Sequence, residues 1–170
     1  MNPSELKSVS KTQISLLAKN LTAADIGFLV ETLAEKDDKL RYNAFLLLQA
    51  HSKIAATVYP HWNVLEKKLD SDNSYQRSLG VMLLAENVRW DIDDRFKDVL
   101  GKFWVCCNDE KFITARQTIQ ALATVMQSTE KYNGAIKQGL LKLKFDMYKE
   151  NQQSLLKRDV EKTLKLVDKR

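Results

Sequence analysis

Residues that could bind a metal or perform catalysis are few in this sequence, and they are widely spaced. The two histidines, His51 and His61, fall in different expected helices, and neither is three or four residues from a cysteine or from the other histidine. Transition-metal sites need several such ligands at one point. The glycines are scattered singly, without a phosphate-binding or dinucleotide-binding loop. The sequence therefore predicts no metal site, no cofactor and no catalytic residue.

The two cysteines, Cys106 and Cys107, are adjacent in the segment GKFWVCCND. A disulfide between neighbouring residues is strained, and no adjacent arginine or histidine favours a reactive thiolate. We expect both to pack as small hydrophobic residues in a reducing compartment. The chain has no apolar run suited to a signal peptide and none near the roughly 20 residues of a membrane span. These features predict a cytoplasmic protein that does not enter a membrane.

Three carboxylates occur together in the segment Trp90–Arg95, at Asp91, Asp93 and Asp94. Clustered carboxylates can bind a hard cation or serve in acid–base chemistry. The segment lacks the glycine and the terminal glutamate of an EF-hand loop. We interpret these acids as the start of a helix, where the helix dipole favours negative charge.

Composition and charge indicate one helical domain over residues 1–170. Only 5 Gly and 2 Pro occur, which favours long helices with short connections. The net charge is +5, and from Lys131 to Arg170 there are 11 Lys and Arg against 5 Asp and Glu. All the positive excess thus lies near the C-terminus. It is either the polar outer surface of a terminal repeat or a surface for phosphate or an acidic partner.

A pattern of one arginine followed by apolar residues occurs three times. Each arginine has a small or apolar residue three positions later and apolar residues six and seven positions later, which places an apolar stripe on one helix face. The spacings of 36 and 39 residues are typical of helical repeats. The three sets are Arg41, Ala44, Leu47 and Leu48; Arg77, Gly80, Leu83 and Leu84; and Arg116, Ile119, Leu122 and Ala123.

A second apolar helix precedes each arginine-bearing helix, so the repeating unit is a helix pair. The stripe Ile26, Leu29, Val30 and Leu33 recurs 36 residues later, with only Glu66 breaking the match. Thr22 and Asp25 have the spacing of a helix N-cap. The predicted segments are a cap helix at 4–20, repeats at 22–52, 57–87 and 91–127, and a degenerate terminal repeat at 132–168.

These pairs resemble the HEAT-repeat family. In that family the second helix begins with an acid, then an arginine, a small residue and leucines, and the first helix often carries a proline, as Pro60 does here. The resemblance is clear over about residues 22–127. It implies an all-α fold, a right-handed α–α superhelix of about four helix pairs with an N-terminal cap helix. A compact helical bundle is the alternative.

The resemblance also implies that the second helices line a concave surface that binds a partner. We expect a protein partner and a non-catalytic scaffold function. The alternative for the arginines is structural, since each could bridge to an acid of the neighbouring repeat. The predicted partner-binding residues are Arg41, Asn43, Gln76, Arg77, Arg116, Lys157 and Arg158.

Nucleic acid is the alternative partner. HEAT-like DNA glycosylases, which remove alkylated bases, cradle duplex DNA with helix pairs that carry aromatic and acidic residues. This chain offers Trp62, Trp90 and Trp104 together with its basic C-terminal end. It is nearly neutral through residue 130, whereas a duplex binder normally carries basic residues along its whole groove. An enzyme of another kind and the oligomeric state both stay open.

Overall fold

The computed structural model describes residues 1–166, in which all regular secondary structure is helical, as the sequence predicts. Four short 3₁₀ turns join or extend the α-helices: η1 (Lys11–Gln13), η2 (Ala56–His61), η3 (Lys68–Asp70) and η4 (Val88–Trp90). The α-helices are α1 (Pro3–Ser8), α2 (Ile14–Ala18), α3 (Ala23–Thr32), α4 (Asp38–Ser52), α5 (Trp62–Lys67), α6 (Ser74–Asn87), α7 (Phe96–Cys107), α8 (Phe112–Ser128), α9 (Asn133–Lys142) and α10 (Glu150–Leu164).

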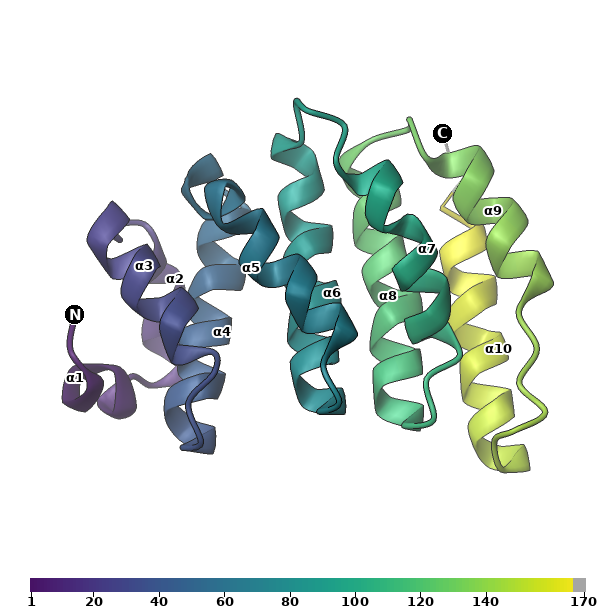
Figure 1. Ribbon diagram of the computed structural model, residues 1–170, viewed down its shortest axis with the longest axis horizontal. Helices are drawn as coiled ribbons and strands as arrows, with labels where there is room; N and C mark the ends of the chain where they lie inside the picture. The colour runs from purple at the N-terminus through teal and green to yellow at the C-terminus, as the bar shows by residue number, and fades with distance from the viewer. Residues whose placement is uncertain (167–170) are drawn as a thin grey trace.

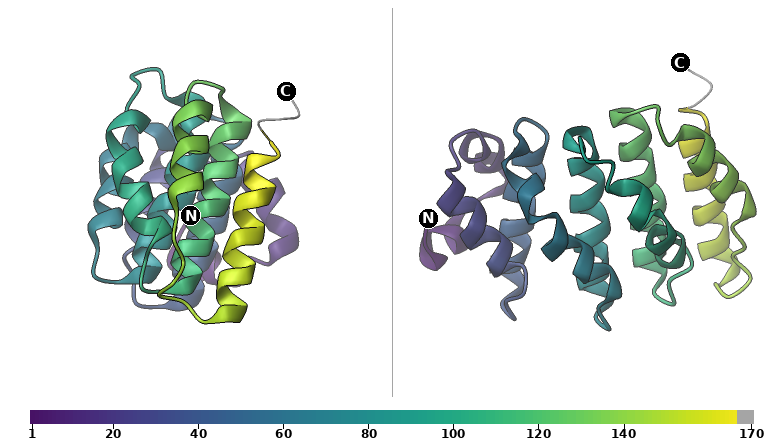
Figure 2. Two further views of the ribbon diagram at one scale, coloured as in Figure 1. Left: turned by 90° about the vertical axis from the view of Figure 1, so that its right-hand side faces the viewer. Right: turned by 45° about the horizontal axis from the view of Figure 1, so that its top comes forward.

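The helices form two layers in a row of pairs (Figures 1 and 2). Helices α4, α6, α8 and α10 lie side by side in chain order and form the second-helix layer. Helices α3, α5, α7 and α9 cover one side of it, and each packs on the second helix of its own pair. The principal contacts therefore join neighbours along the row. The other side of the second-helix layer is left open.

The core repeats in the predicted register. Leu47, Leu83 and Leu122 are each fully buried, at equivalent positions on α4, α6 and α8. Phe96 and Phe103 of α7 are also fully buried and meet edge to face, with ring centroids 5.1 Å apart. Burying apolar area of this kind supplies most of the stability of such a stack.

The N-terminal segment differs from the single cap helix predicted at 4–20. It breaks at Val9–Ser10 into α1 and the run of η1 and α2, because Ser10 takes an extended conformation. The Asn43 amide of α4 donates hydrogen bonds to the Leu6 and Val9 carbonyls, at 2.9 and 3.1 Å. The Leu6 carbonyl also accepts from the Val9 amide at 3.2 Å, so the Asn43 bonds tie the end of α1 to α4.

A cap residue and a proline determine where the first helices of two of the pairs begin. Thr22 and Asp25 form the predicted cap, in which the Asp25 amide donates to the Thr22 hydroxyl at 3.2 Å. The first helix of the second pair is shorter than the sequence predicts. Pro60 lies in the 3₁₀ turn η2, and only Trp62–Lys67 is α-helical there. Proline has no backbone N–H to donate, which limits the helix before it.

Candidate functional site

Two of the predicted contact residues, Arg77 and Arg116, hold successive pairs together. Arg77 of α6 donates from Nε and Nη2 to the buried carboxylate of Asp109, at 2.6 and 2.8 Å. Arg116 of α8 donates from Nε to the buried Asp159 of α10 at 2.6 Å. The hydrogen bonds that Arg77 donates to the Asp109 carboxylate favour its charged form and so raise the pKa of Arg77. This is the structural alternative that the sequence left open for the repeated arginine.

Arg41 makes a different contact at the equivalent position. Its guanidinium lies over the Tyr75 ring of α6, 4.2 Å from the centroid, and also bonds Asp38 and the Glu35 carbonyl. The first repeat thus joins the second through an aromatic ring instead of a carboxylate.

The other predicted contacts divide into buried and exposed residues. Asn43 is buried against α1, and the Gln76 amide donates to the Leu33 carbonyl at 2.7 Å. Lys157 and Arg158 of α10 are exposed and make no ion pair with another residue of 1–166. Of the seven, only these two have uncommitted charged groups. Partner binding stays a prediction for all seven.

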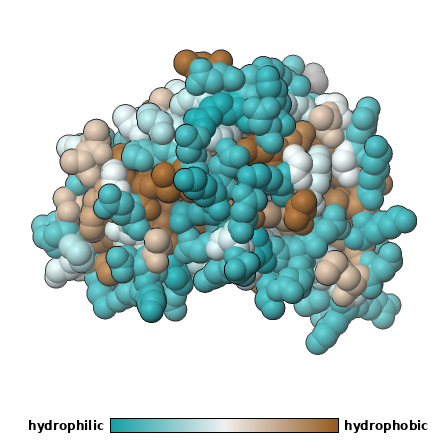
Figure 3. Space-filling model, viewed as in Figure 1, coloured by the Kyte–Doolittle hydropathy of each residue, from teal (hydrophilic) through white to brown (hydrophobic). Residues whose placement is uncertain are grey.

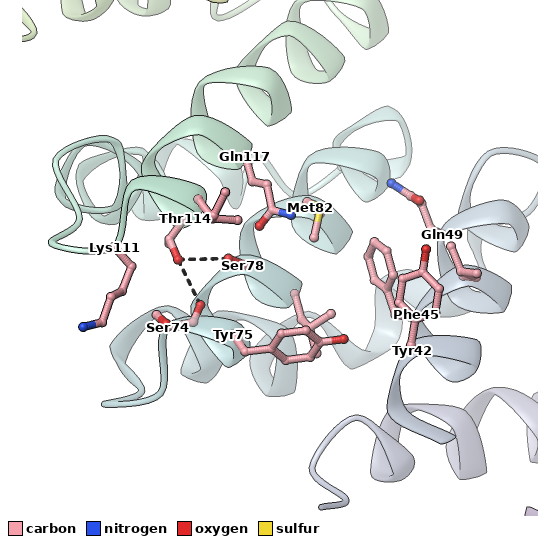
Figure 4. Close-up of a pocket in the computed structure, with 13 residues that line it drawn as sticks. Tyr42, Phe45, Gln49, Ser74, Tyr75, Ser78, Met82, Lys111, Thr114 and Gln117 are labelled. Atoms are coloured by element: carbon pink, nitrogen blue, oxygen red, sulfur yellow. Dashed lines mark hydrogen bonds between the residues drawn. The ribbon is translucent and has the colours of Figure 1, made fainter. Parts of the chain in front are cut away.

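The open side of the second-helix layer contains a groove that the sequence did not reveal. It lies along α6 between α4 and α8 and encloses about 620 Å³ (Figure 4). Helix α4 supplies one wall, α6 the floor, and α8 the other wall. The lining residues are Tyr42, Phe45, Leu46, Gln49, Ser74, Tyr75, Ser78, Leu79, Met82, Lys111, Ile113, Thr114 and Gln117. We refer to this as the α6 groove.

The rims of the α6 groove carry exposed hydrophobic side chains. Tyr42 is 40% exposed and Ile113 is 57% exposed, on opposite walls. Large apolar groups gathered around a hollow mark an interaction surface more often than isolated ones do. Spacing offered one signal for this surface: Tyr42, Leu46 and Gln49 recur at four and three residues. Figure 3 shows the other side of the molecule, over the first helices, where hydrophilic residues predominate.

Two hydroxyls on the floor of the groove are already hydrogen-bonded. The hydroxyls of Ser78 and Thr114 lie 3.0 Å apart, and Thr114 also donates to the Ser74 carbonyl at 3.2 Å (Figure 4). An apolar group placed over Ser78 and Thr114 therefore leaves neither of these hydroxyls without a partner, which avoids the usual cost of covering them.

Toward the C-terminal ends of α6 and α8, the lining of the groove includes the side-chain amides of several glutamines. A smaller hollow of about 140 Å³ continues the groove and shares Gln49, Met82 and Gln117 with it. The side-chain oxygen Oε1 of Gln117 is buried without a hydrogen-bond partner. Lys111 is the one charged residue lining either hollow, and its ammonium group lies 3.4 Å from Glu110. The groove therefore has no charged group turned into it.

Helix α10 carries cations that make no ion pair with another residue of 1–166. Gln153, Lys157 and Leu164 line a hollow between α10 and α9. At 3.6 residues per turn, Arg158 and Lys162 project from the side of α10 that faces away from α9. Both are exposed, on the helix that packs against α8 at the end of the second-helix layer.

The cysteines and the acidic residues considered for catalysis have structural roles. Burial raises the pKa of the Cys106 thiol to about 11, so it stays protonated at neutral pH. Asp91 accepts hydrogen bonds from the amides of Arg95 and Phe96 at 2.9 and 2.8 Å, as expected of an acid at a helix start. Asp93 instead accepts from the Tyr59 hydroxyl at 3.0 Å, and Asp94 pairs with Lys131 at 2.7 Å. Within residues 1–166, no three histidine, cysteine or acidic side chains converge on a possible metal position.

The three tryptophans each pack against other parts of the fold. Trp62 is fully buried, and Trp90 donates from its indole nitrogen to the Ser52 carbonyl at 2.7 Å. Trp104 is half-buried and covers Gly139 of α9, where a Cβ atom would lie 2.2 Å from the ring.

Comparison of the chain with models of known protein families gives no match, and comparison with curated proteins gives none of significant similarity. Across residues 1–166, no helix has the length and apolar character needed to span a membrane.

Proposed function

We propose that this chain is a non-catalytic protein-interaction module, a HEAT-like right-handed superhelix that holds a partner protein on the open face of α4, α6, α8 and α10. The observation that supports this is the α6 groove, a mainly apolar hollow with exposed aromatic and aliphatic side chains on its rims. Both cysteines are free and buried, in keeping with a cytoplasmic location.

The side chains of this surface are of the kinds that give affinity for a protein partner rather than for a small molecule. Interfaces gain most of their affinity from a few aromatic and aliphatic side chains that fill pockets, surrounded by contacts that exclude water. Tyr42, Tyr75 and Met82 offer such contacts across two of the three helices. Each repeat of a stacked array buries only the surfaces between neighbours, so a continuous face is left for a partner.

A capture experiment with groove variants tests the proposal. The tagged chain is incubated with lysate of its own host, with and without nuclease, and bound proteins are identified by mass spectrometry. Met82→Glu places a charge in the groove, and Ile92→Glu places the same charge at a residue that is 90% exposed and outside the groove. We expect one protein to survive nuclease treatment and to be lost only with Met82→Glu. Identical capture by both variants would contradict the proposal.

Nucleic-acid binding is the second candidate, and the unpaired charges of the last pair favour it. Eight cations in residues 133–166 make no ion pair with another residue of 1–166, although the two preceding second helices bind their arginines to carboxylates. They are Lys137, Lys142, Lys144, Lys149, Lys157, Arg158, Lys162 and Lys165.

Salt dependence distinguishes this candidate from the first. Contacts to phosphates release counterions, so the affinity for a 20-base-pair duplex should fall about 10³-fold or more between 50 and 200 mM salt if six or more phosphates are contacted. Fluorescence anisotropy with labelled duplex measures this directly. Absence of binding at 50 mM salt would eliminate the candidate.

A further inference from the structure

The α6 groove has the size and shape of a seat for one more helix. Neighbouring helices pack with their axes about 8–10 Å apart, so a helix laid over α6 at that distance would reach with its side chains between those of α4 and α8. The side chains of Ser74 and Ser78, which line the groove over α6, are small. From Lys111 to Thr124, the lining of α8 spans about 20 Å at 1.5 Å per residue, which matches a partner helix of about 13 residues.

We infer that the occupant is an amphipathic α-helix of a partner protein, with an apolar face and acidic flanks; this inference rests on the proposed function. The apolar face follows from the lining, in which aromatic and aliphatic residues lie over satisfied hydroxyls. Helices bound in grooves present anchors at positions i, i+3, i+4 and i+7. The unpartnered Gln117 Oε1 accepts a hydrogen bond from a polar donor beside those anchors.

The acidic flanks follow from the charges on both sides of the groove. Lys11 lies over the Tyr42 ring on the α4 side, 5.8 Å from the centroid. Arg158 and Lys162 stand on the α10 side, and no acidic residue lines either hollow of the groove. A helix with acids along its flanks brings opposite charges together, whereas a basic helix places like charges beside these three cations.

Selection from a displayed library of helical 16-residue peptides shows which side chains of a partner helix the groove binds, because the library favours no charge or pattern in advance. The full chain is immobilised, and peptides that also bind Met82→Glu are removed. Selected peptides are labelled, and their Kd is measured by fluorescence anisotropy against three forms of the chain. The first is the natural sequence, and the second is the double variant Arg158→Glu with Lys162→Glu. The third, Lys137→Glu with Lys142→Glu, makes the same charge change on α9, away from the groove.

We expect selected peptides to share apolar residues at i, i+3, i+4 and i+7 with acids beside them. Their Kd should rise at least tenfold with the α10 double variant and stay within twofold with the α9 double variant. Circular dichroism and urea unfolding verify that each variant is folded.

The other outcomes separate failure of this inference from failure of the proposed function. Peptides that depend on Met82 but are neutral or basic would overturn the acidic-helix inference and leave the groove as a protein-binding site. No peptide that depends on Met82 would overturn both. Self-association in sedimentation equilibrium that disappears with Met82→Glu would make a second copy of the chain the occupant, and would also overturn the inference.

Discussion

The middle of the stack and its last pair use the same residue types for different purposes. In the middle, Arg77 and Arg116 each reach the carboxylate of the following pair, Asp109 and Asp159. In the last pair, Arg158 and its neighbouring lysines find no such acid within residues 1–166. A cation becomes structural where the next repeat places an acid in reach. In the last described pair, where no such acid is within reach among residues 1–166, the cations Lys157 and Arg158 face solvent.

The helices of the middle pairs also pack more closely than those of the last pair. Helix α6 lies between α4 and α8 and contacts both closely. Helices α9 and α10 are joined by the connection 143–149 and pack on each other less extensively than the helices of the earlier pairs do. The middle pairs therefore should dominate stability, and the last pair should tolerate substitution. The predictions below test that division, from the largest expected effect to the smallest.

Removing a core leucine from the middle should have the largest effect. Leu83→Ala should lower the free energy of unfolding by about 2–5 kcal/mol, because it leaves a cavity at a fully buried position. Leu141→Ala, at a residue of α9 that is 66% exposed, should change it by less than about 0.5 kcal/mol. Urea unfolding followed by circular dichroism measures both. Equal losses would mean that burial of Leu83 does not contribute to stability in the way assigned to it.

Removing the bridging arginine should have the next largest effect. Arg77→Leu leaves the buried Asp109 carboxylate without its partner and should cost about 2–3 kcal/mol, somewhat below the range for fully buried pairs because Arg77 keeps partial solvent contact. Arg158→Leu is the matched change on α10 and should stay within about 0.5 kcal/mol. A similar loss for both would show that unpaired cations of the last pair also stabilise the fold.

Two glycines test how tightly the last pair is held to the third. Gly139→Ala forces the Trp104 ring away from α9 and should cost about 1–3 kcal/mol. Gly101→Ala, in open space on α7, should stabilise by about 0.5–1 kcal/mol through helix propensity. Tryptophan fluorescence should shift in Gly139→Ala alone. No loss of stability in that variant would mean that the last pair adjusts freely.

The smallest effect concerns Asp94, which links the third pair to the start of the fourth. Hydrogen bonds from Lys131 and Tyr132 lower the pKa of this carboxyl from 3.8 to about 2. The folded state therefore binds the proton less tightly, and the contribution of Asp94 to stability is present above pH 3.8 and is lost as the pH falls toward 2.

Asp94→Asn isolates this contribution, because asparagine tolerates the left-handed backbone found at Asp94, with φ of 58°. The melting temperature of the variant should be lower than that of the natural sequence at pH 7, and the difference should close near pH 2. A difference that is constant over this range would exclude the ion pair as its cause.

The sequence by itself determined the helices, their pairing in repeats and the buried register. Leu47, Leu83 and Leu122 could be aligned because a helix places residues three and four apart on one face, which is a local property of the chain. The cap at Thr22 and Asp25 was predictable for the same reason. The break after α1 was not, because it depends on Asn43, more than 30 residues away.

Tertiary structure alone decided which residues act together. Arg77 and Asp109 are 32 residues apart, and no spacing rule for a single helix connects them. The α6 groove likewise combines walls from α4 and α8 over a floor of α6, and each helix alone shows only a few exposed apolar residues. Packing of three helices fixes the hollow between them, so the binding surface appears only when the pairs are stacked.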